Sequence, residues 1–141
     1  MESANVHLVR SIYAAWERGD YSSAEWAHPE IEYVHGDGAT PGSWRGLADM
    51  AAAWRDWLGA WEEYHTEADE YRELDDERVL VLAHASGRGK TSGLEVGEMR
   101  TMGASLFHVR DGKVTRLVNY FDRERAMAEL GLASEADPPR A

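Results

Sequence analysis

The chain has 141 residues, a length that fits one domain, and carries 26 acidic against 15 basic side chains, a formal net charge of −11. This balance argues against nucleic-acid binding, because contacts to phosphates need clustered positive charge. The absence of cysteine excludes disulfides, thiolate metal sites and cysteine-based catalysis. The opening residues lack the pattern of a secretory signal, and no apolar run is long enough to span a membrane, so we expect a cytoplasmic protein.

A helix is predicted at the start of the chain. Apolar side chains recur at spacings of three and four from Val6 to Trp16, which is the period of one helix face. Ser3 or Asn5 can cap the start of this helix, and Gly19 supplies its end.

The region up to residue 63 is predicted to alternate between helix, strand and loop. We expect a short helix over 22–27, a strand over 31–35, a loop over 36–46 and a long helix over 47–63. Strand alternation puts Ile31, Tyr33 and His35 on one face. The apolar stripe of the long helix continues as far as Trp61.

The second half of the chain is predicted to consist mainly of strands. We expect strands over 66–74, 79–85, 99–110 and 113–121, a connection over 88–96, a last helix over 123–130 and a disordered tail over 134–141. The highly charged first strand suits a sheet edge. Asp111 and Gly112 form a two-residue hairpin turn, and Asp122 caps the last helix. The order of elements predicts a single α+β domain over 1–133, with a curved antiparallel sheet wrapped around helices.

The hairpin turn also predicts which side chains share a face, because directly opposed residues point the same way. If Arg110 pairs with Lys113, Leu106 pairs with Leu117. One face then holds Met102, Ala104, Leu106, His108, Thr115, Leu117, Asn119 and Phe121, and the other holds Gly103, Ser105, Phe107, Val109, Val114, Arg116, Val118 and Tyr120.

Several stretches resemble a known family. The segments 13–20, 28–33 and 44–46 are similar to the start of SnoaL-like domains, and 107–114 with 119–122 is similar to their final hairpin. The resemblance covers about residues 5–132 and places the chain in the nuclear-transport-factor-2-like (NTF2-like) superfamily. It implies a cone-shaped α+β barrel around an apolar pocket. The scaffold hosts polyketide cyclases, ketosteroid isomerases, epoxide hydrolases, dehydratases and non-catalytic modules, so function must come from the site.

The resemblance implies that two of these activities lack their reacting groups here. Where related epoxide hydrolases carry ionisable side chains on the middle strand, this chain has Ala83 and Ala85, which leaves no carboxylate to activate water. The ketosteroid isomerases place their base near the position of His35. Their oxyanion donors fall on Ile12 and on Ala104 or Ser105, so we expect the enolate to lack its donors.

The polar residues left in the implied pocket are His35, Tyr33 and Asn119. We expect His35 to act as a general base beside a carbonyl group, with Asn119 and Tyr33 as hydrogen-bond donors, as in a cofactor-free polyketide cyclase or isomerase. The ligand-binding walls are expected to be Trp16, Trp26, Trp54, Trp57, Ala83, Ala85, Met102, Leu106, Leu117 and Phe121. No metal site and no cofactor are expected.

Two alternatives remain open. His35 also fits a structural role at the pocket rim, bonded to the loop that follows it, and the chain then binds a small hydrophobic molecule without turnover or serves mainly to dimerise. The apolar outer face, which includes Leu80, Leu82 and His84, predicts a homodimer interface. No nucleic acid or membrane is expected as a partner.

Overall fold

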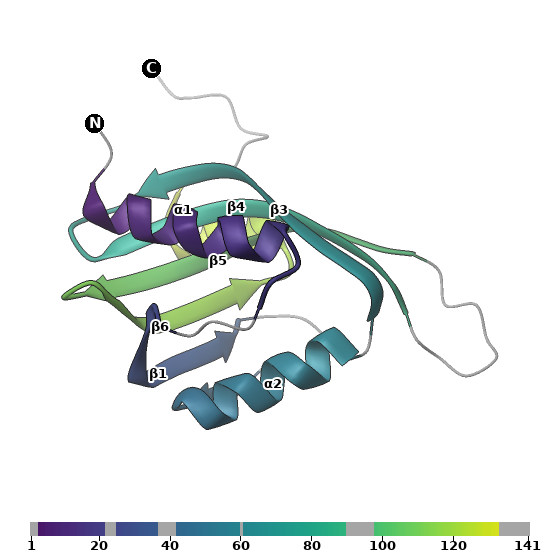
Figure 1. Ribbon diagram of the computed structural model, residues 1–141. Coiled ribbons are helices and arrows are strands. Elements are labelled where there is room, and N and C mark those ends of the chain that lie inside the picture. Colours follow the sequence, from purple (N-terminus) through teal and green to yellow (C-terminus); the bar gives the residue numbers. More distant parts are fainter. Residues whose placement is uncertain (1–2, 22–24, 37–41, 60, 90–97, 133–141) are drawn as a thin grey trace, which may run out of the picture.

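The computed structural model describes residues 3–21, 25–36, 42–59, 61–89 and 98–132. A curved mixed sheet dominates the molecule (Figure 1). Its six strands lie in the order β2-β1-β6-β5-β4-β3, and because β2 and β3 do not pair, the sheet is not closed into a barrel. All neighbours run antiparallel except β1 and β6, which are parallel. The predicted α+β class is confirmed.

The helices and strands have the following bounds: α1 Ala4–Glu17, β1 Ala27–His35, β2 Gly42–Arg45, α2 Leu47–Gly59, β3 Trp61–Glu73, β4 Arg78–Gly89, β5 Glu98–Arg110, β6 Lys113–Tyr120 and α3 Arg123–Glu129. In Figure 1, α1 lies across β3 and β4, and α2 lies beside β1. Helix α2 contacts β1 and β2 at one edge of the sheet and β3 at the other. It therefore bridges the two open edges and gives the fold its cone-like shape.

Helix α1 forms where the apolar period predicts it. The side chain of Ser3 caps its start by accepting a hydrogen bond from the backbone N–H of Val6 at 3.2 Å. Gly19 adopts a φ of 80° just beyond its end, a conformation that favours glycine. The last residue of the helix, Glu17, accepts a hydrogen bond from the N–H of Ala68 at 2.9 Å, which ties α1 to the edge strand β3.

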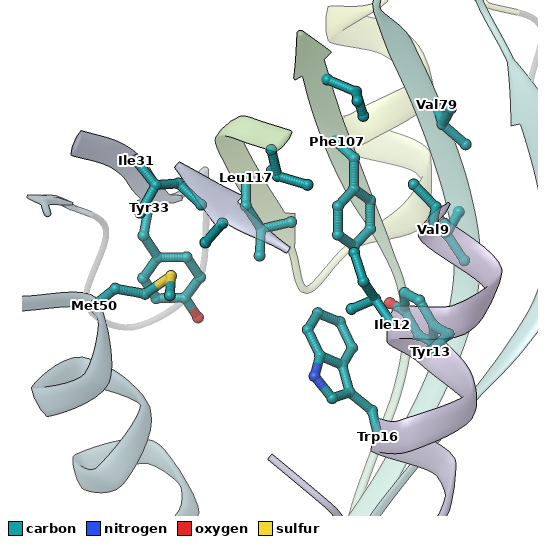
Figure 2. Packing of buried hydrophobic residues seen from close by; sticks show 14 of the residues in the cluster. Val9, Ile12, Tyr13, Trp16, Ile31, Tyr33, Met50, Val79, Phe107 and Leu117 are labelled. Carbon is teal, nitrogen blue, oxygen red and sulfur yellow. The ribbon is translucent and has the colours of Figure 1, made fainter. Parts of the chain in front are cut away.

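Two apolar clusters lie on opposite faces of the sheet. The inner cluster joins α1 and α2 to the concave face, and Figure 2 shows Phe107 at its centre, beside Leu117 and the α1 side chains. The outer cluster lies under α3 and consists of Leu80, Leu82, Ala104, Leu106, Val118, Tyr120, Ala126 and Met127. Both faces of the first half of β4 are therefore buried, which explains the continuous apolar sequence from Val79 to Ala83.

A β-bulge overturns part of the predicted register. The turn is as predicted, with Asp111 and Gly112 at φ values of 53° and 75°, and Val109 pairs with Val114. Thr115 is then an extra residue in β6, so that from this point every pair is shifted by one. The observed pairs are His108 with Arg116, Phe107 with Leu117, Leu106 with Val118, Ser105 with Asn119 and Ala104 with Tyr120. The expected pairing of Leu106 with Leu117 is wrong.

The bulge exchanges the two faces of β5. Leu106 is buried under α3, and Met102 is 56% exposed on the same outer side, so neither side chain reaches the concave face as expected. Phe107 and Val109, which were expected on the outer face, belong to the inner cluster. The β6 residues after Thr115 keep their predicted sides, whereas Val114, which precedes it, lies in the inner cluster rather than on the expected outer face.

Three further expectations are wrong in their boundaries. The expected helix over 22–27 is replaced from residue 25 by a turn, and β1 begins at Ala27; residues 22–24 lie outside the described residues. Part of the expected loop over 36–46 is strand β2, which pairs with β1. The long helix ends at Gly59 rather than residue 63, because the following residues pair with the end of β4. Strand formation there overrides the helical period.

The remaining expectations divide between confirmed features and residues outside the description. The charged segment 66–74 belongs to the edge strand β3, as predicted. Asp122 caps α3 by accepting a hydrogen bond from the N–H of Glu124 at 3.0 Å. Most of the expected connection over 88–96, and the tail over 134–141, lie outside the described residues.

A buried arginine fixes α3 to the outer face. The guanidinium of Arg123 donates to the carbonyl oxygens of Ala83 at 3.1 Å and Gly103 at 3.3 Å, and to the Asp69 carboxylate at 2.8 Å. The same carboxylate contacts His84 Nδ1 at 2.8 Å. Helix α3 therefore covers part of the face that was expected to form a homodimer interface, and leaves the region around His84 and Met102 open.

We expect Gly103→Ala to lower the free energy of unfolding by about 1–3 kcal/mol, because an added Cβ overpacks a dense region. That Cβ would lie 2.4 Å from the carbonyl oxygen of Tyr120, a backbone atom that cannot rotate away. Gly59→Ala is the matched control, because a Cβ there meets nothing within 4 Å and alanine favours helix. Urea denaturation of both variants checks this, and equal stabilities would contradict it.

We expect the protein to lose stability in mild acid through His108. Burial and the neighbouring Arg116 and Arg78 lower the pKa of His108 from its ordinary value of 6.5, with opposing contributions from Asp75 and Glu77. Its buried Nε2 atom has no hydrogen-bond partner among the described residues. The unfolded chain therefore binds the proton more readily, and stability falls as the pH drops below 6.5.

The test of this acid effect compares His108→Gln with wild type between about pH 7.5 and pH 5.5, where histidine ordinarily titrates. The variant should lose less stability over this interval than wild type. The exposed His7 provides the control variant His7→Gln, which should follow wild type. An equal loss in all three proteins would show that His108 does not couple folding to pH.

Candidate functional site

A cavity lies between the concave face of the sheet, the end of α1 and helix α2. Its volume is about 80 Å³, measured as the space open to the centre of a water-sized sphere. The described residues that line it are Tyr13, Trp16, Tyr21, Tyr33, His35, Trp54, Trp57, Leu58, Tyr64, Thr66, Ala83, His84, Ala85, Thr101, Gly103, Ala104, Ser105, Asn119, Tyr120 and Phe121. Many of these residues are aromatic and none is Asp, Glu, Lys or Arg, so the described lining carries no permanent charge.

The helical side of the cavity is a connected set of aromatic rings. The ring of Trp54 lies 4.8 Å from Trp16 and 5.6 Å from Tyr21, centre to centre. Trp57 lies 5.1 Å from Phe121 and 6.1 Å from Tyr64. Such a wall suits a flat apolar ligand that packs against ring faces and edges.

The sheet side carries a continuous chain of five hydrogen-bonded side chains. Tyr13 Oη lies 2.9 Å from Ser105 Oγ, which donates to Asn119 Oδ1 at 2.8 Å. Asn119 Nδ2 donates to Tyr33 Oη at 3.0 Å, and Tyr33 Oη lies 3.0 Å from His35 Nε2. In Figure 2 the Tyr33 hydroxyl points toward the space between α1 and α2. The chain connects α1, β5, β6 and β1 across the cavity wall.

The donors and acceptors in this chain run in one direction. Ser105 has one hydroxyl proton and gives it to Asn119, so the Tyr13 hydroxyl must donate to Ser105. Tyr33 Oη accepts from the Asn119 amide, and its own proton is therefore available for His35 Nε2. With Nε2 as the acceptor, neutral His35 carries its proton on Nδ1.

The two tyrosines at the sheet side remain protonated. Burial raises the pKa of Tyr13 and of Tyr33 well above the ordinary value, against smaller opposing effects from their hydrogen bonds to Ser105 and Asn119. Both hydroxyls are therefore hydrogen-bond donors at neutral pH. Neither is placed to act as an anion.

His35 lies inside the fold, with 8% of its surface exposed. Its ring centre is 4.8 Å from Trp44, 5.4 Å from Phe121 and 6.5 Å from Trp57. We call the hydrogen-bonded row from Tyr13 to His35 the polar wall, and the set of rings on the helical side the aromatic wall. Edge contacts with the rings and the bond to Tyr33 hold the imidazole where these two walls meet. The expected alternative, a bond from His35 to the loop that follows it, concerns residues 37–41, which lie outside the described residues.

Most of the expected site residues lie in the cavity lining, and four do not. The lining includes His35, Asn119, Tyr33, Trp16, Trp54, Trp57, Ala83, Ala85 and Phe121. Leu117 is buried in the inner cluster, and Trp26 packs on Trp16 but faces a separate hollow beside the β5–β6 hairpin. Met102 and Leu106 lie on the outer face because of the bulge in β6.

Sequence reasoning missed two hydroxyls that belong to the polar wall. Tyr13 takes the place on α1 at which we expected Ile12, and Ser105 lines the cavity because the bulge turns it inward. Hydroxyl groups therefore stand on both α1 and β5 at this wall, and they bond each other. The spacing of three residues places Tyr13 on the same helix face as Trp16, and this was the only pattern in the sequence that pointed to Tyr13. Nothing in the sequence indicated the bulge that turns Ser105 inward.

No group of three or more His, Asp or Glu side chains is placed to hold a metal ion within the described ranges. Over the same ranges, no helix has both the length and the apolar character needed to cross a bilayer.

The chain was then compared with known proteins. A family model described as a SnoaL-like domain matches residues 9–117. No protein in a curated set is similar enough in sequence to count as a match.

Several solved structures share the fold. An NTF2-like protein of unknown function from Burkholderia pseudomallei K96243 has 20% identity and a TM-score of 0.73, covering 90% of this chain and 97% of its own. A candidate polyketide cyclase from Xanthomonas campestris pv. campestris has 21% identity and a TM-score of 0.68, covering 90% and 96%. A candidate SnoaL-like polyketide cyclase from Jannaschia sp. CCS1 has 16% identity and a TM-score of 0.71, covering 98% and 95%.

At these identities the structures establish the shared architecture, and the family model covers well over half of the sequence. The curved sheet, the bridging helix α2 and the cavity between them agree with that assignment. The chain belongs to the family of SnoaL-like domains.

Proposed function

We propose that the protein binds a compact, uncharged cyclic carbonyl compound in the cavity, and that His35 moves a proton on it without a cofactor. The main support is the hydrogen-bonded chain that ends on His35 Nε2 in a cavity whose described lining is rich in aromatic rings and holds no Asp, Glu, Lys or Arg. A basic nitrogen beside an oriented hydroxyl is the minimum equipment for proton abstraction next to a carbonyl. This is the reaction type of a polyketide cyclase or an isomerase.

The size of the cavity restricts the ligand. Its volume of about 80 Å³ is well below the about 300–1,000 Å³ typical of pockets for drug-sized molecules. One or two fused rings fit such a space better than a steroid does. The absence of charged groups from the described lining favours a neutral ligand, because a charged one would lose its hydration without gaining a partner.

The proposed chemistry uses an exchange of hydrogen bonds at Tyr33. When a carbonyl oxygen enters, the Tyr33 hydroxyl turns from His35 to that oxygen, and the Nε2 lone pair becomes free to accept the proton from the adjacent carbon. Breaking the C–H bond leaves an enolate whose oxygen accepts from Tyr33, while Asn119 Nδ2 continues to donate to the Tyr33 oxygen. The imidazolium then returns the proton to another carbon, or to the alkoxide formed when the enolate attacks a second carbonyl.

A second candidate function is ligand binding without turnover. The observation that favours it is that no carboxylate is present among the described lining residues. An imidazolium formed at His35 would therefore have no negative side chain beside it in the described lining, which opposes proton abstraction. The two functions share the ligand class and differ only in whether a C–H bond is broken.

Deuterium exchange distinguishes the two functions. In D₂O, we expect wild type to accelerate exchange of the protons next to the carbonyl of 1-tetralone, followed by proton NMR. His35→Ala should slow this exchange by a factor of about 10²–10⁴, the usual contribution of a general base. Tyr33→Phe should slow it less, because Asn119 can still donate to the enolate.

The control for this experiment is His65→Ala, which removes a histidine with a 52% exposed side chain and should exchange at the wild-type rate. Binding of 1-tetralone to each variant is measured separately by calorimetry. Binding by wild type without accelerated exchange would reject catalysis on this probe and leave the binding function. Equal exchange by His35→Ala and wild type would reject His35 as the base.

We also propose that the protein forms a homodimer through the part of the outer sheet face that α3 leaves open. Met102 is the large hydrophobic side chain among the described residues that is most exposed, and His84 is its partner in the register of β4 and β5. Contact with a second copy of the chain would remove the apolar surface of Met102 from water.

We therefore expect Met102→Glu to convert the dimer into a monomer, measured by light scattering during gel filtration. The control Ala52→Glu adds the same charge at an exposed position of α2 and should leave the assembly unchanged. A monomeric wild type would contradict the proposed dimer, and so would a dimer that survives Met102→Glu.

A further inference from the structure

Two polar atoms on the helical side of the cavity have no hydrogen-bond partner among the residues that the structure describes. These are the Tyr21 hydroxyl and the Trp54 indole nitrogen, both buried. The polar side chains of the sheet side differ, since Tyr13, Ser105, Asn119, Tyr33 and His35 all take part in hydrogen bonds with one another. Buried polar groups in folded proteins are nearly always paired, so an unpaired one calls for an explanation.

Both atoms belong to residues that line the same cavity. Their ring centres are 5.6 Å apart, and the Trp54 ring is also 6.0 Å from that of Tyr33. Trp54 comes from α2 and Tyr21 from the segment after α1, whereas the bonded polar groups come mainly from the sheet. A ligand in the cavity therefore lies between two sides. On the sheet side the polar groups are already hydrogen-bonded to one another, and on the helical side the two polar atoms are not.

The chemistry of the two groups specifies what is missing. An indole N–H can only donate, so the partner of Trp54 must be an acceptor. Burial raises the pKa of Tyr21, with a further contribution from Tyr64, so the Tyr21 hydroxyl also keeps its proton. The described part of the chain supplies no acceptor to either group.

We propose that Tyr21 and Trp54 form a second anchoring point of the cavity, and that the ligand carries two acceptor oxygens on one compact ring system, as a quinone or cyclic dicarbonyl does. One oxygen meets Tyr33 and His35, and the other accepts from Trp54 and Tyr21. This inference rests on the proposed function, because it assumes that the cavity binds a carbonyl compound. The inference specifies that the compound has two acceptor oxygens, and that Tyr21 and Trp54 donate hydrogen bonds to the second of them.

Stability of the free protein provides the first test. Tyr21→Phe removes an unpaired hydroxyl and should leave the unfolding temperature unchanged or raise it, because the lost group had no bond in the free state. Tyr33→Phe is the matched control: it removes a hydroxyl with two bonded neighbours and should lower the unfolding temperature. Equal losses in the two variants would show that Tyr21 already has a partner and would overturn the inference.

Binding of three matched probes provides the second test. Naphthalene, 1-tetralone and 1,4-naphthoquinone have similar ring systems with no, one and two carbonyl oxygens, and their affinities are measured by calorimetry. The quinone has no cysteine to alkylate in this chain. Trp54→Phe and Tyr21→Phe should each weaken quinone binding about tenfold, the value of one hydrogen bond, while changing tetralone binding much less.

The controls separate this inference from the proposed function. Trp26→Phe alters a tryptophan outside the cavity lining and should leave all three affinities unchanged. Trp54→Phe could instead weaken the binding of the quinone and of tetralone equally, or weaken the binding of neither. Either result would mean that only water bonds to the Trp54 and Tyr21 atoms. The second anchoring point would then be rejected, while the proposed binding of a carbonyl compound would stand. If no probe binds wild type, the proposed function fails, and the inference fails with it.

Discussion

One extra residue in the last strand determines which side chains meet in the cavity. The bulge at Thr115 shifts β6 against β5 by one position, and this shift brings Ser105 opposite Asn119 on the concave face. With a regular hairpin, Ala104 would take that position, and Asn119 would face a methyl group. The shift also moves Phe107 beneath α1, where it fills the centre of the inner cluster. Core packing and the polar wall therefore depend on the same backbone irregularity.

Much of the architecture could be predicted from residue patterns. The period from Val6 to Trp16 gave α1, the alternation of Tyr33 and His35 gave their shared face, and Asp111-Gly112 gave the turn. Each of these patterns involves residues that are close together in the sequence, and such residues are enough to determine a helix face, a strand face or a turn. The family resemblance supplied the concave face and thereby Asn119.

The missed features have physical causes that are not local. A two-residue turn fixes only the first pairs of a hairpin, so a bulge three residues beyond it leaves no mark that alternation can reveal. Because a helix turns 100° per residue, Ile12 and Tyr13 both qualify for the inner face by period, and only packing decides between them. The apolar period of α2 continues past Gly59, but sheet pairing determines that the chain extends from Trp61.

The polar wall combines strong orientation with weak charge. The side chains of Tyr13, Ser105, Asn119 and Tyr33 are neutral, and so is the unprotonated imidazole of His35. The wall therefore avoids the large cost of burying ions. Orientation arises from the fixed sequence of donors, in which the Asn119 amide sets the direction because its oxygen and nitrogen cannot exchange roles. An amide does not relay protons as hydroxyls do. The row therefore aligns Tyr33 and His35 electrostatically and keeps Tyr13 at the other end from exchanging protons with them.

The parallel pairing of β1 with β6 has a consequence for how the protein is made. Tyr33 bonds to Asn119, 86 residues further along the chain, and Tyr13 bonds to Ser105, 92 residues away. None of these bonds can form while a ribosome still holds the last strand in its exit tunnel. Contacts of such sequence separation also slow folding, because long loops must close before the contacts form. The nascent chain therefore carries its tryptophan-rich first half without the wall that completes the cavity until β6 has left the ribosome.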